Sequence, residues 1–112
     1  MAYNMAKSPE WHERAYEESI GLPAEIDYET LKEMSTLNLI FKESLRLNSP
    51  VPVLAREAVK DTSLDGYFVP KGTLILAEPQ AVHSNPQVWN EPGRFDPGRF
   101  TPERAEDRVT DG

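Results

Sequence analysis

The chain has 112 residues, of which 19 are acidic, 12 are basic and none is cysteine, so its formal net charge is −7. An excess of negative charge argues against nucleic acid as a partner, because binding to phosphates depends on clustered Lys and Arg side chains. The absence of cysteine excludes a disulfide framework, a thiolate metal site and a cysteine nucleophile among these residues.

The first 48 residues are predicted to be helical. Ser8-Pro9-Glu10 is a typical helix start and Gly21 a typical stop, so a helix is predicted over residues 8–20. Asp27 can cap a brief second helix. A third helix is predicted over residues 36–48 and is ended by Pro50.

The third helix carries Glu43 and Arg46 on one face. Apolar residues flank this pair and cover most of the remaining circumference, so we expect the helix to be buried. An exposed pair would contribute only about 0.2–0.5 kcal/mol. A buried pair, which we favour, needs a further partner because taking two charges out of water is costly. Arg94 and Arg99, each held between a Gly and a Phe, are both candidates.

Residues 53–78 follow a period of two, which is typical of strands. Strands are predicted over residues 54–59, 67–69 and 73–77, with turns at Asp65-Gly66 and Pro70-Lys71-Gly72. We expect a small antiparallel hairpin system packed near the third helix. Arg56, in the first of these strands, is either a surface charge on an edge strand or an anion-binding residue.

Residues 79–104 are predicted to form a short helix, near residues 79–83, and then a proline-rich meander. Prolines recur there every five or six residues, which excludes regular helix or sheet. We expect the rings of Trp89, Phe95 and Phe100 to pin the meander. The polar tail, residues 105–112, is predicted to be frayed.

Other known site patterns are missing. His12 and His83 are far apart in sequence, so we predict no metal site, and a capped turn explains His83. Glycine-rich phosphate loops, H-E-x-x-H and G-x-S-x-G do not occur. The longest apolar runs fall far below the roughly 20 residues of a membrane span, and no signal peptide opens the chain. From these features we expect a cytoplasmic protein with no membrane segment in this chain.

Four motifs, in order, resemble the cytochrome P450 family. They are the E-x-x-R helix in Lys42 to Leu47, the Pro-Lys-Gly hairpin segment in Tyr67 to Thr73, the H-x-x-P-x-x-W stretch in Val82 to Trp89, and the F-x-P-x-R-F motif in Phe95 to Phe100. The last has Gly98 where the family usually has Glu. Arg56 follows Arg46 by ten residues, where the family often places a haem-propionate arginine.

The resemblance implies an α+β fold that is part of a cytochrome P450: helices, then a small antiparallel hairpin system, then the meander, all in one fragment, 1–112. It implies that Glu43, Arg46 and Arg99 form a buried structural triad, and so selects Arg99 over Arg94. Residues 8–20 resemble the helix that precedes the E-x-x-R helix, and residues 1–7 the last turn of the long helix that crosses the haem.

The resemblance also implies a haem-dependent monooxygenase that inserts one oxygen atom from O₂ into a small apolar substrate. Its implied partner is a ferredoxin or a flavoprotein reductase. The family's cysteine-bearing haem loop would follow Gly112 and its oxygen-activating helix would precede Met1, so we expect this chain to be inactive alone and to bind no haem stably. Catalytic and metal-ligating residues are therefore not predicted.

Two alternatives remain open. In the first, the chain is a non-enzymatic scaffold or protein-interaction module that retains part of the fold. The helix of residues 36–48 should then expose apolar surface that other helices once covered. In the second, the end of the sequence reflects a mis-called gene or a cloning boundary.

Overall fold

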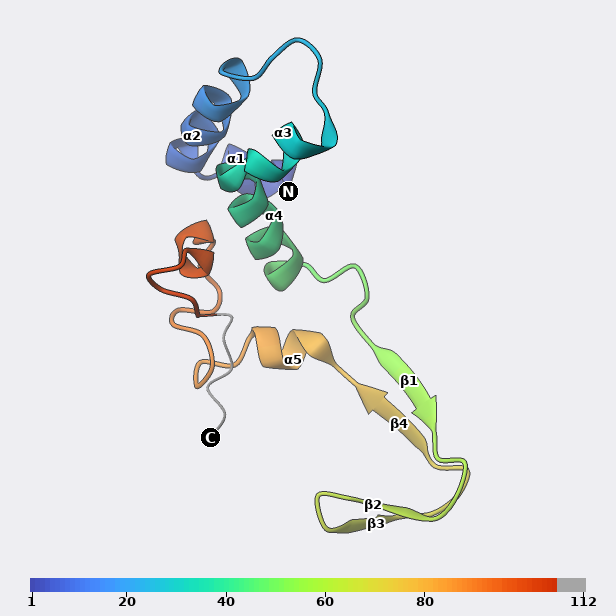
Figure 1. Ribbon diagram of the computed structural model, residues 1–112. Helices are drawn as coiled ribbons and strands as arrows, with labels where there is room; N and C mark the ends of the chain where they lie inside the picture. Colours follow the sequence, from blue (N-terminus) through green and yellow to red (C-terminus); the bar gives the residue numbers. More distant parts are fainter. Residues whose placement is uncertain (107–112) are drawn as a thin grey trace.

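A computed structural model describes residues 1–106 of the chain. These residues form two parts, seen in Figure 1. Residues 1–49 and 78–106 make a helical body, and residues 54–77 make a strand arm that projects from it. Helices and short antiparallel strand pairs are both present, so the predicted α+β class is confirmed.

Four helices form the first half of the body: α1 (Ala2–Ala6), α2 (Pro9–Ile20), α3 (Tyr28–Glu33) and α4 (Ser35–Leu47). The side chain of Ser8 makes no capping hydrogen bond to α2, although it stands at the expected position. Asp27 does cap α3, because its carboxylate accepts a hydrogen bond from the Thr30 amide at 2.8 Å. Within residues 1–106, no helix has the length and apolar character needed to cross a bilayer.

Glu18 of α2 fixes the start of α4. Its Oε1 accepts a hydrogen bond from the Thr36 amide at 2.8 Å, and its Oε2 accepts one from the Leu37 amide at 3.0 Å. The first amides of a helix have no partner inside it, so Glu18 caps α4 from a neighbouring helix. Burial tends to raise the pKa of Glu18, but these hydrogen bonds outweigh it and lower that pKa.

Only one face of α4 is buried, so the prediction of a helix buried on most sides is wrong. Ile40, Glu43 and Arg46 are buried, whereas Phe41 is 54% exposed and Leu45 is 38% exposed. Within the described chain, α2, the later helix α5 (Pro79–His83) and the 3₁₀ helix η1 (Pro97–Phe100) are the elements that pack most against α4. They cover the face with Ile40 and the charged pair and leave Phe41 and Leu45 in contact with solvent.

The strand arm consists of two antiparallel pairs. Its strands are β1 (Leu54–Glu57), β2 (Thr62–Leu64), β3 (Tyr67–Val69) and β4 (Leu74–Ala77), with β1 paired to β4 and β2 paired to β3. Asp65 and Gly66, with φ of 47° and 81°, make the β2–β3 turn. Positive φ at both central residues is typical of a type I′ hairpin turn. The sequence pattern predicted this turn and three of the strands but missed β2.

The arm does not pack near α4, so that prediction is also wrong (Figure 1). Pro50 and Pro52 favour extended backbone at the residues before them. The connection from α4 to β1 therefore leads the chain away from the body. Among the residues of the arm, Ala58 alone is buried.

The second half of the body contains α5, the meander and η1. Asp96 caps η1, since its Oδ1 accepts a hydrogen bond from the Gly98 amide at 3.1 Å. The ring of Trp89 is buried and lies 5.7 Å from the Phe100 ring and 6.4 Å from the His83 ring, measured between centroids. These contacts explain how a segment without regular structure keeps one path.

The prediction of a frayed tail is wrong for residue 106. The Glu106 amide donates a hydrogen bond to the Arg99 carbonyl at 3.0 Å, so residue 106 is tied to η1. The remainder of that prediction, residues 107–112, lies outside the described residues.

Candidate functional site

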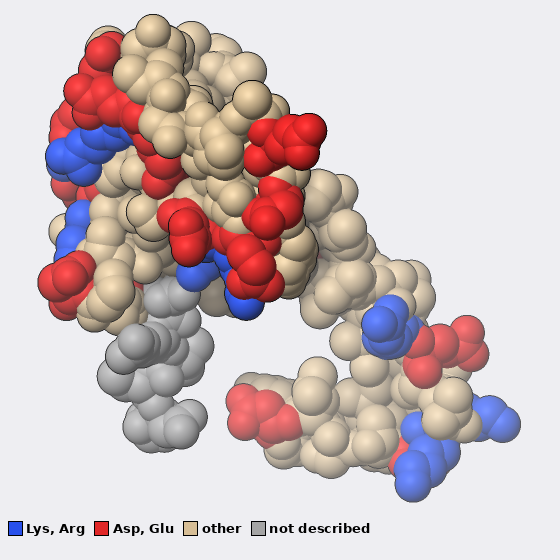
Figure 2. Space-filling model, turned by 45° about the horizontal axis from the view of Figure 1, so that its top comes forward, with Lys and Arg blue, Asp and Glu red and all other residues tan. Residues whose placement is uncertain are grey.

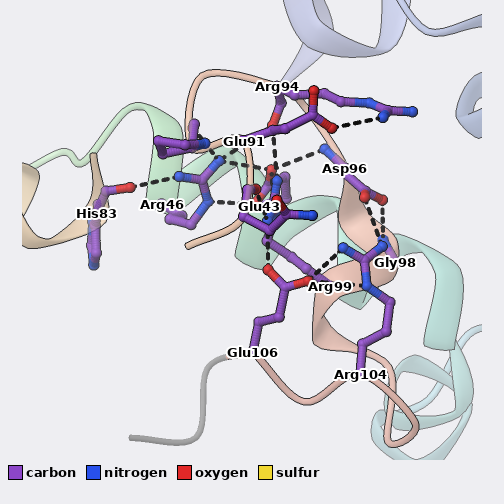
Figure 3. Close-up of polar contacts among 12 residues, drawn as sticks. Glu43, Arg46, His83, Glu91, Arg94, Asp96, Gly98, Arg99, Arg104 and Glu106 are labelled. Carbon is purple, nitrogen blue, oxygen red and sulfur yellow. Dashed lines mark hydrogen bonds and ion pairs between the residues drawn. The ribbon is translucent and has the colours of Figure 1, made fainter. Parts of the chain in front are cut away.

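A cluster of charged side chains joins α4 to the meander (Figure 3). Glu43 and Arg46 lie one turn apart on α4, which points both side chains to the same face. Arg46 donates two hydrogen bonds to the Glu43 carboxylate, from Nε at 2.7 Å and from Nη2 at 2.9 Å. Glu43 is 0% exposed and Arg46 is 3% exposed, so this bidentate pair is shielded from water.

Arg99 reaches the same carboxylate from η1. Its Nε donates a hydrogen bond to Glu43 Oε1 at 3.2 Å, across 56 residues of sequence, and its side chain is 1% exposed. The Asp96 amide donates to the same oxygen at 2.9 Å. With the two bonds from Arg46, Glu43 accepts four hydrogen bonds, three at Oε1 and one at Oε2, which offset its loss of hydration.

Other N–H groups of Arg46 and Arg99 bind backbone carbonyls of the meander and of α5. Arg46 donates to the carbonyl of His83 at 2.7 Å and to that of Pro92 at 2.8 Å. Arg99 donates to the carbonyl of Asn90 at 2.9 Å, and both guanidinium groups reach the Arg94 carbonyl at 3.3 Å. The two side chains therefore satisfy carbonyls that have no strand or helix partner.

Trp89 lies beside both guanidinium groups. The Arg46 guanidinium carbon is 5.2 Å from the centroid of the Trp89 ring, and that of Arg99 is 5.9 Å away. A desolvated cation against an indole face is attracted by the ring quadrupole. Trp89 thus adds apolar cover and an electrostatic contact to the same cluster.

Three further charged residues border the cluster on its outer side. Arg104 donates from Nη1 to Asp96 Oδ2 at 2.7 Å and from Nε to Glu106 Oε1 at 3.1 Å. Arg99 Nη1 in turn donates to Glu106 Oε2 at 2.6 Å. Figure 3 shows Arg99, Arg104, Asp96 and Glu106 turned toward one another around η1.

The two outer carboxylates have lowered pKa values. For Glu106, burial would raise the pKa, but hydrogen bonds from Arg104 and Arg99, together with their charges, lower it. For Asp96, burial acts in the same direction and is outweighed by the hydrogen bond and the charge of Arg104. Both groups are therefore held in their charged form.

Arg94 and Arg99 have different environments. The Arg94 side chain is exposed and pairs with Glu91 at 3.2 Å, while its backbone carbonyl accepts from the cluster. Of the two arginines that the sequence left as candidates for a further partner of Glu43, Arg99 is the one whose side chain lies in contact with it.

Arg56 lies apart from the cluster, on β1 of the strand arm. Its side chain is exposed and its Nη1 donates a hydrogen bond to the neighbouring Ala55 carbonyl at 2.8 Å. In the register of the arm it stands opposite Ile75 of β4. The structure therefore does not bring Arg56 together with Glu43, Arg46 and Arg99.

The histidines do not form a metal site with other ligands in the part of the chain that the structure describes. His12 is exposed on α2. His83 ends α5, and its contribution to the cluster is its backbone carbonyl.

A hollow of about 550 Å³ lies between the first two helices, the end of α4 and the meander. Tyr3, Trp11 and Phe95 are among its lining residues, together with Lys7 and Arg94. Lys7 lies over the Tyr3 ring, with its Nζ 4.7 Å from the centroid, and Arg94 is paired with Glu91. The hollow is aromatic and its cations already have partners, so it suggests no chemistry of its own.

The sequence pattern missed the outer residues Asp96, Arg104 and Glu106. The echo Pro102-Glu103-Arg104 after the repeated Pro-Gly-Arg-Phe motif was a signal for another arginine near η1. Pairing of that arginine with Glu106 depends on the turn of residues 101–105, where Ala105 has a φ of 43°. The polar composition of this segment does not by itself predict such a turn.

Comparison with known proteins identifies the family. The family model for cytochrome P450 matches residues 1–111. A relative from Mycobacterium tuberculosis, with the name cytochrome P450 136, is 43% identical over 107 residues, which is 95% of this chain and 22% of the relative. Human cytochrome P450 4F2 is 41% identical over 112 residues, again covering 95% of this chain and 22% of the relative.

A solved structure agrees with these sequence matches. The retinoic acid-bound cyanobacterial CYP120A1 superimposes with a TM-score of 0.83 at 33% identity, covering 94% of this chain and 25% of that protein. The chain thus spans about a fifth to a quarter of the length of the proteins it matches. The resemblance found in the four motifs is confirmed, and the chain belongs to the cytochrome P450 family.

Proposed function

We propose that the chain is a portion of a haem-dependent monooxygenase that hydroxylates a small apolar substrate with O₂. The observation that carries this proposal is the family match over residues 1–111, because cytochromes P450 are haem monooxygenases. Two similar proteins, a mouse leukotriene-B4 omega-hydroxylase and a retinoic acid-bound cyanobacterial protein, have names that refer to largely apolar lipids, in support of a largely apolar substrate.

The role proposed for Glu43, Arg46 and Arg99 is structural. Support comes from the hydrogen bonds that this triad makes to α4, α5 and the meander at once. Buried charges with all partners in place favour one arrangement over alternatives, because any other arrangement leaves a charge unpaired. The triad would hold the meander in a fixed position against α4.

The residues of this chain fit the haem only in part. The sequence contains no cysteine, so it does not supply the thiolate iron ligand of the family. Arg56 does suit a haem propionate, because its guanidinium is exposed and an arginine binds a carboxylate in a bidentate manner. We therefore infer that these 112 residues alone do not catalyse the reaction, and that an iron ligand and an electron donor, a ferredoxin or a flavoprotein reductase, come from outside them.

A chimera tests the proposal. The matching quarter of the cyanobacterial CYP120A1 is replaced by residues 1–106 of this chain, and the reduced protein is exposed to carbon monoxide. We expect the red-shifted Soret band of a thiolate-ligated ferrous–CO complex. A chimera with Arg56→Gln should lose haem faster, whereas the control Lys60→Gln, on the same arm, should retain it.

The opposite results would contradict the proposal. A folded chimera that binds no haem would reject the monooxygenase role and would favour the alternative of a protein-interaction module. That alternative draws its support from the exposed apolar side chains of the arm and of α4, among them Phe41, Val59 and Phe68. Equal haem loss in the Arg56→Gln and Lys60→Gln chimeras would reject the role of Arg56.

A further inference from the structure

We propose that Glu106 is a fourth member of the buried charge cluster and that it neutralises the positive charge that Glu43, Arg46 and Arg99 leave inside the protein. The inference deepens the proposed structural role of the triad and rests on it. It concerns a positioning residue in this chain and does not depend on haem binding.

The triad by itself is not neutral. It contains one carboxylate and two guanidinium groups, and each of the three residues is 3% exposed or less. The formal charge of the group is therefore +1 in a place that water does not reach. An uncompensated buried charge is strongly destabilising, so a nearby anion is required.

Glu106 is in position to supply that anion. Its Oε2 lies 2.6 Å from Arg99 Nη1, whereas the bond to Glu43 is made by Arg99 Nε, and its side chain is 20% exposed. Its backbone amide also donates to the Arg99 carbonyl at 3.0 Å. Two separate contacts thus bind residue 106 to the arginine whose charge it balances.

Other carboxylates near the cluster are already committed. Asp96 pairs with Arg104 at 2.7 Å and caps η1 with its other oxygen, and Glu91 pairs with the exposed Arg94 at 3.2 Å. Of the described carboxylates, Glu43 and Glu106 are those that contact a buried guanidinium. The compensating charge is therefore assigned to Glu106 and not to a diffuse acidic surface.

Arg104 holds Glu106 in place. It donates to Glu106 Oε1 from Nε at 3.1 Å and from Nη2 at 2.5 Å, and it binds Asp96 on its other side. The Asp96 amide donates to Glu43, which closes a ring of interactions around η1. Arg104 and Asp96 form a neutral pair, so the ring adds one net negative charge, that of Glu106.

Gly98 leaves room for this ring. A Cβ atom at position 98 would lie 3.4 Å from Arg104 Nη1 and 3.1 Å from Asp96 Oδ1. The first distance is an ordinary contact, and the second is tight, so a side chain there would make the Asp96 carboxylate shift by a few tenths of an ångström.

Thermal unfolding of the 112-residue chain, followed by circular dichroism, tests the inference. We expect Glu106→Gln to lower the melting temperature by about 10 °C, because it leaves the buried positive charge unbalanced. The matched control is Glu103→Gln, which removes the same charge from an exposed position three residues earlier. We expect a change below about 2 °C for the control.

A double-mutant cycle separates charge balance from a general loss of contacts. With Arg99→Gln in the background, Glu106→Gln should change the unfolding equilibrium constant at least about tenfold less than it does with Arg99 present. If the Arg99 variant does not fold, Glu106→Asp provides the same discrimination, since it keeps the charge and should melt above Glu106→Gln.

Three results would overturn the inference. They are equal melting temperatures for Glu106→Gln and Glu103→Gln, additive losses in the cycle, and equal melting of Glu106→Asp and Glu106→Gln. A wild-type chain without a cooperative transition would also contradict it, because the balanced cluster would then fail to hold α4 and η1 together. None of these measurements involves haem, so their failure is distinct from the failure of the chimera.

Discussion

The helical body and the strand arm are each stabilised by a different kind of interaction. In the body, buried side chains from distant parts of the sequence meet: Glu43 and Arg46 of α4, Arg99 of η1 and Trp89 of the meander. In the arm, backbone hydrogen bonds join two-stranded pairs, and side chains such as Val59 and Phe68 are exposed. Figure 2 shows groups of acidic side chains on the visible body, with basic ones beside them, and charges of both signs on the arm.

The comparison teaches that charge, and not apolar burial alone, makes the long-range connections of this chain. A two-stranded pair without a covered face is only marginally stable in water. The body is stabilised by directional hydrogen bonds. If the meander packed differently on α4, Glu43 would lose hydrogen bonds among the four that it accepts. Changes that remove charge should therefore affect the body, and apolar changes in the arm should have little effect on it.

Acidification should have the largest effect on the body. The folded-state pKa values of Glu18, Asp96 and Glu106 are lowered, so each carboxylate stabilises the fold above the usual carboxyl range near pH 4.3. That stability is lost as the pH falls from there through the lowered pKa values. Fluorescence of Trp89 and Trp11 should therefore report unfolding of the body in acid.

The arm provides the internal comparison in the same experiment. Amide protection in β2 and β3, taken relative to the intrinsic exchange rate at each pH, should respond less to acid, because the ladder bonds there join backbone groups that do not titrate. An unchanged fluorescence signal between pH 7 and about pH 2 would contradict the assignment of these carboxylates to the stability of the body.

Glu43→Gln should have the next largest effect. It leaves two buried guanidinium groups beside a neutral amide, and removing one partner of a buried pair costs about 3–5 kcal/mol of unfolding free energy. Urea denaturation measures this loss. The control is Glu10→Gln, which breaks the exposed Glu10–Arg14 pair on α2 and should cost only about 0.2–0.5 kcal/mol. A comparable loss for both variants would show that burial adds nothing to the cluster.

Glu18→Gln should have an intermediate effect. The carboxylate accepts hydrogen bonds from the Thr36 and Leu37 amides with its two oxygens, whereas a glutamine side chain has only one oxygen. We therefore expect the unfolding free energy to fall by about 1 kcal/mol. Glu17→Gln, at the neighbouring exposed position, is the control and should be near neutral. If the two variants unfold at the same urea concentration, α2 does not stabilise α4 through Glu18.

Local sequence rules predicted part of the local structure of this chain, although they missed β2 and expected a cap from Ser8 that does not form. Asp27 capped the helix expected after it, and Asp65-Gly66 made the expected hairpin turn, because both features depend on a few neighbouring residues. The spacing of Glu43 and Arg46 predicted that they share a helix face, and the need for a further partner followed from the cost of burying them.

Long-range geometry was harder to predict. Arg46 binds the backbone carbonyl of His83, and any residue can offer a carbonyl, so no sequence pattern marks that partner. The exposure of Phe41 was missed because a helical wheel shows which residues share a face but not how many faces have neighbours. Glu106 was assigned to a polar tail for the same reason, since its role depends on where the chain turns.

The smallest effect is expected in the arm. Phe68 is 71% exposed and stands opposite Ser63 in the β2–β3 pair, so Phe68→Ser removes little buried surface. We expect the unfolding free energy of the body to change by no more than about 0.5 kcal/mol. Amide exchange within β2 and β3 should quicken, since a cross-strand contact is lost.

Gly66→Ala is the matched change in the same hairpin. Gly66 has a φ of 81°, and a residue with a Cβ in the left-handed region costs about 1–2 kcal/mol, so this variant should loosen the hairpin more than Phe68→Ser does. Neither variant should alter the fluorescence of Trp89 in the body. If either shifted the urea midpoint of the body as far as Glu18→Gln, the two parts would be coupled, and the distinction between a charge-linked body and a locally stabilised arm would fail.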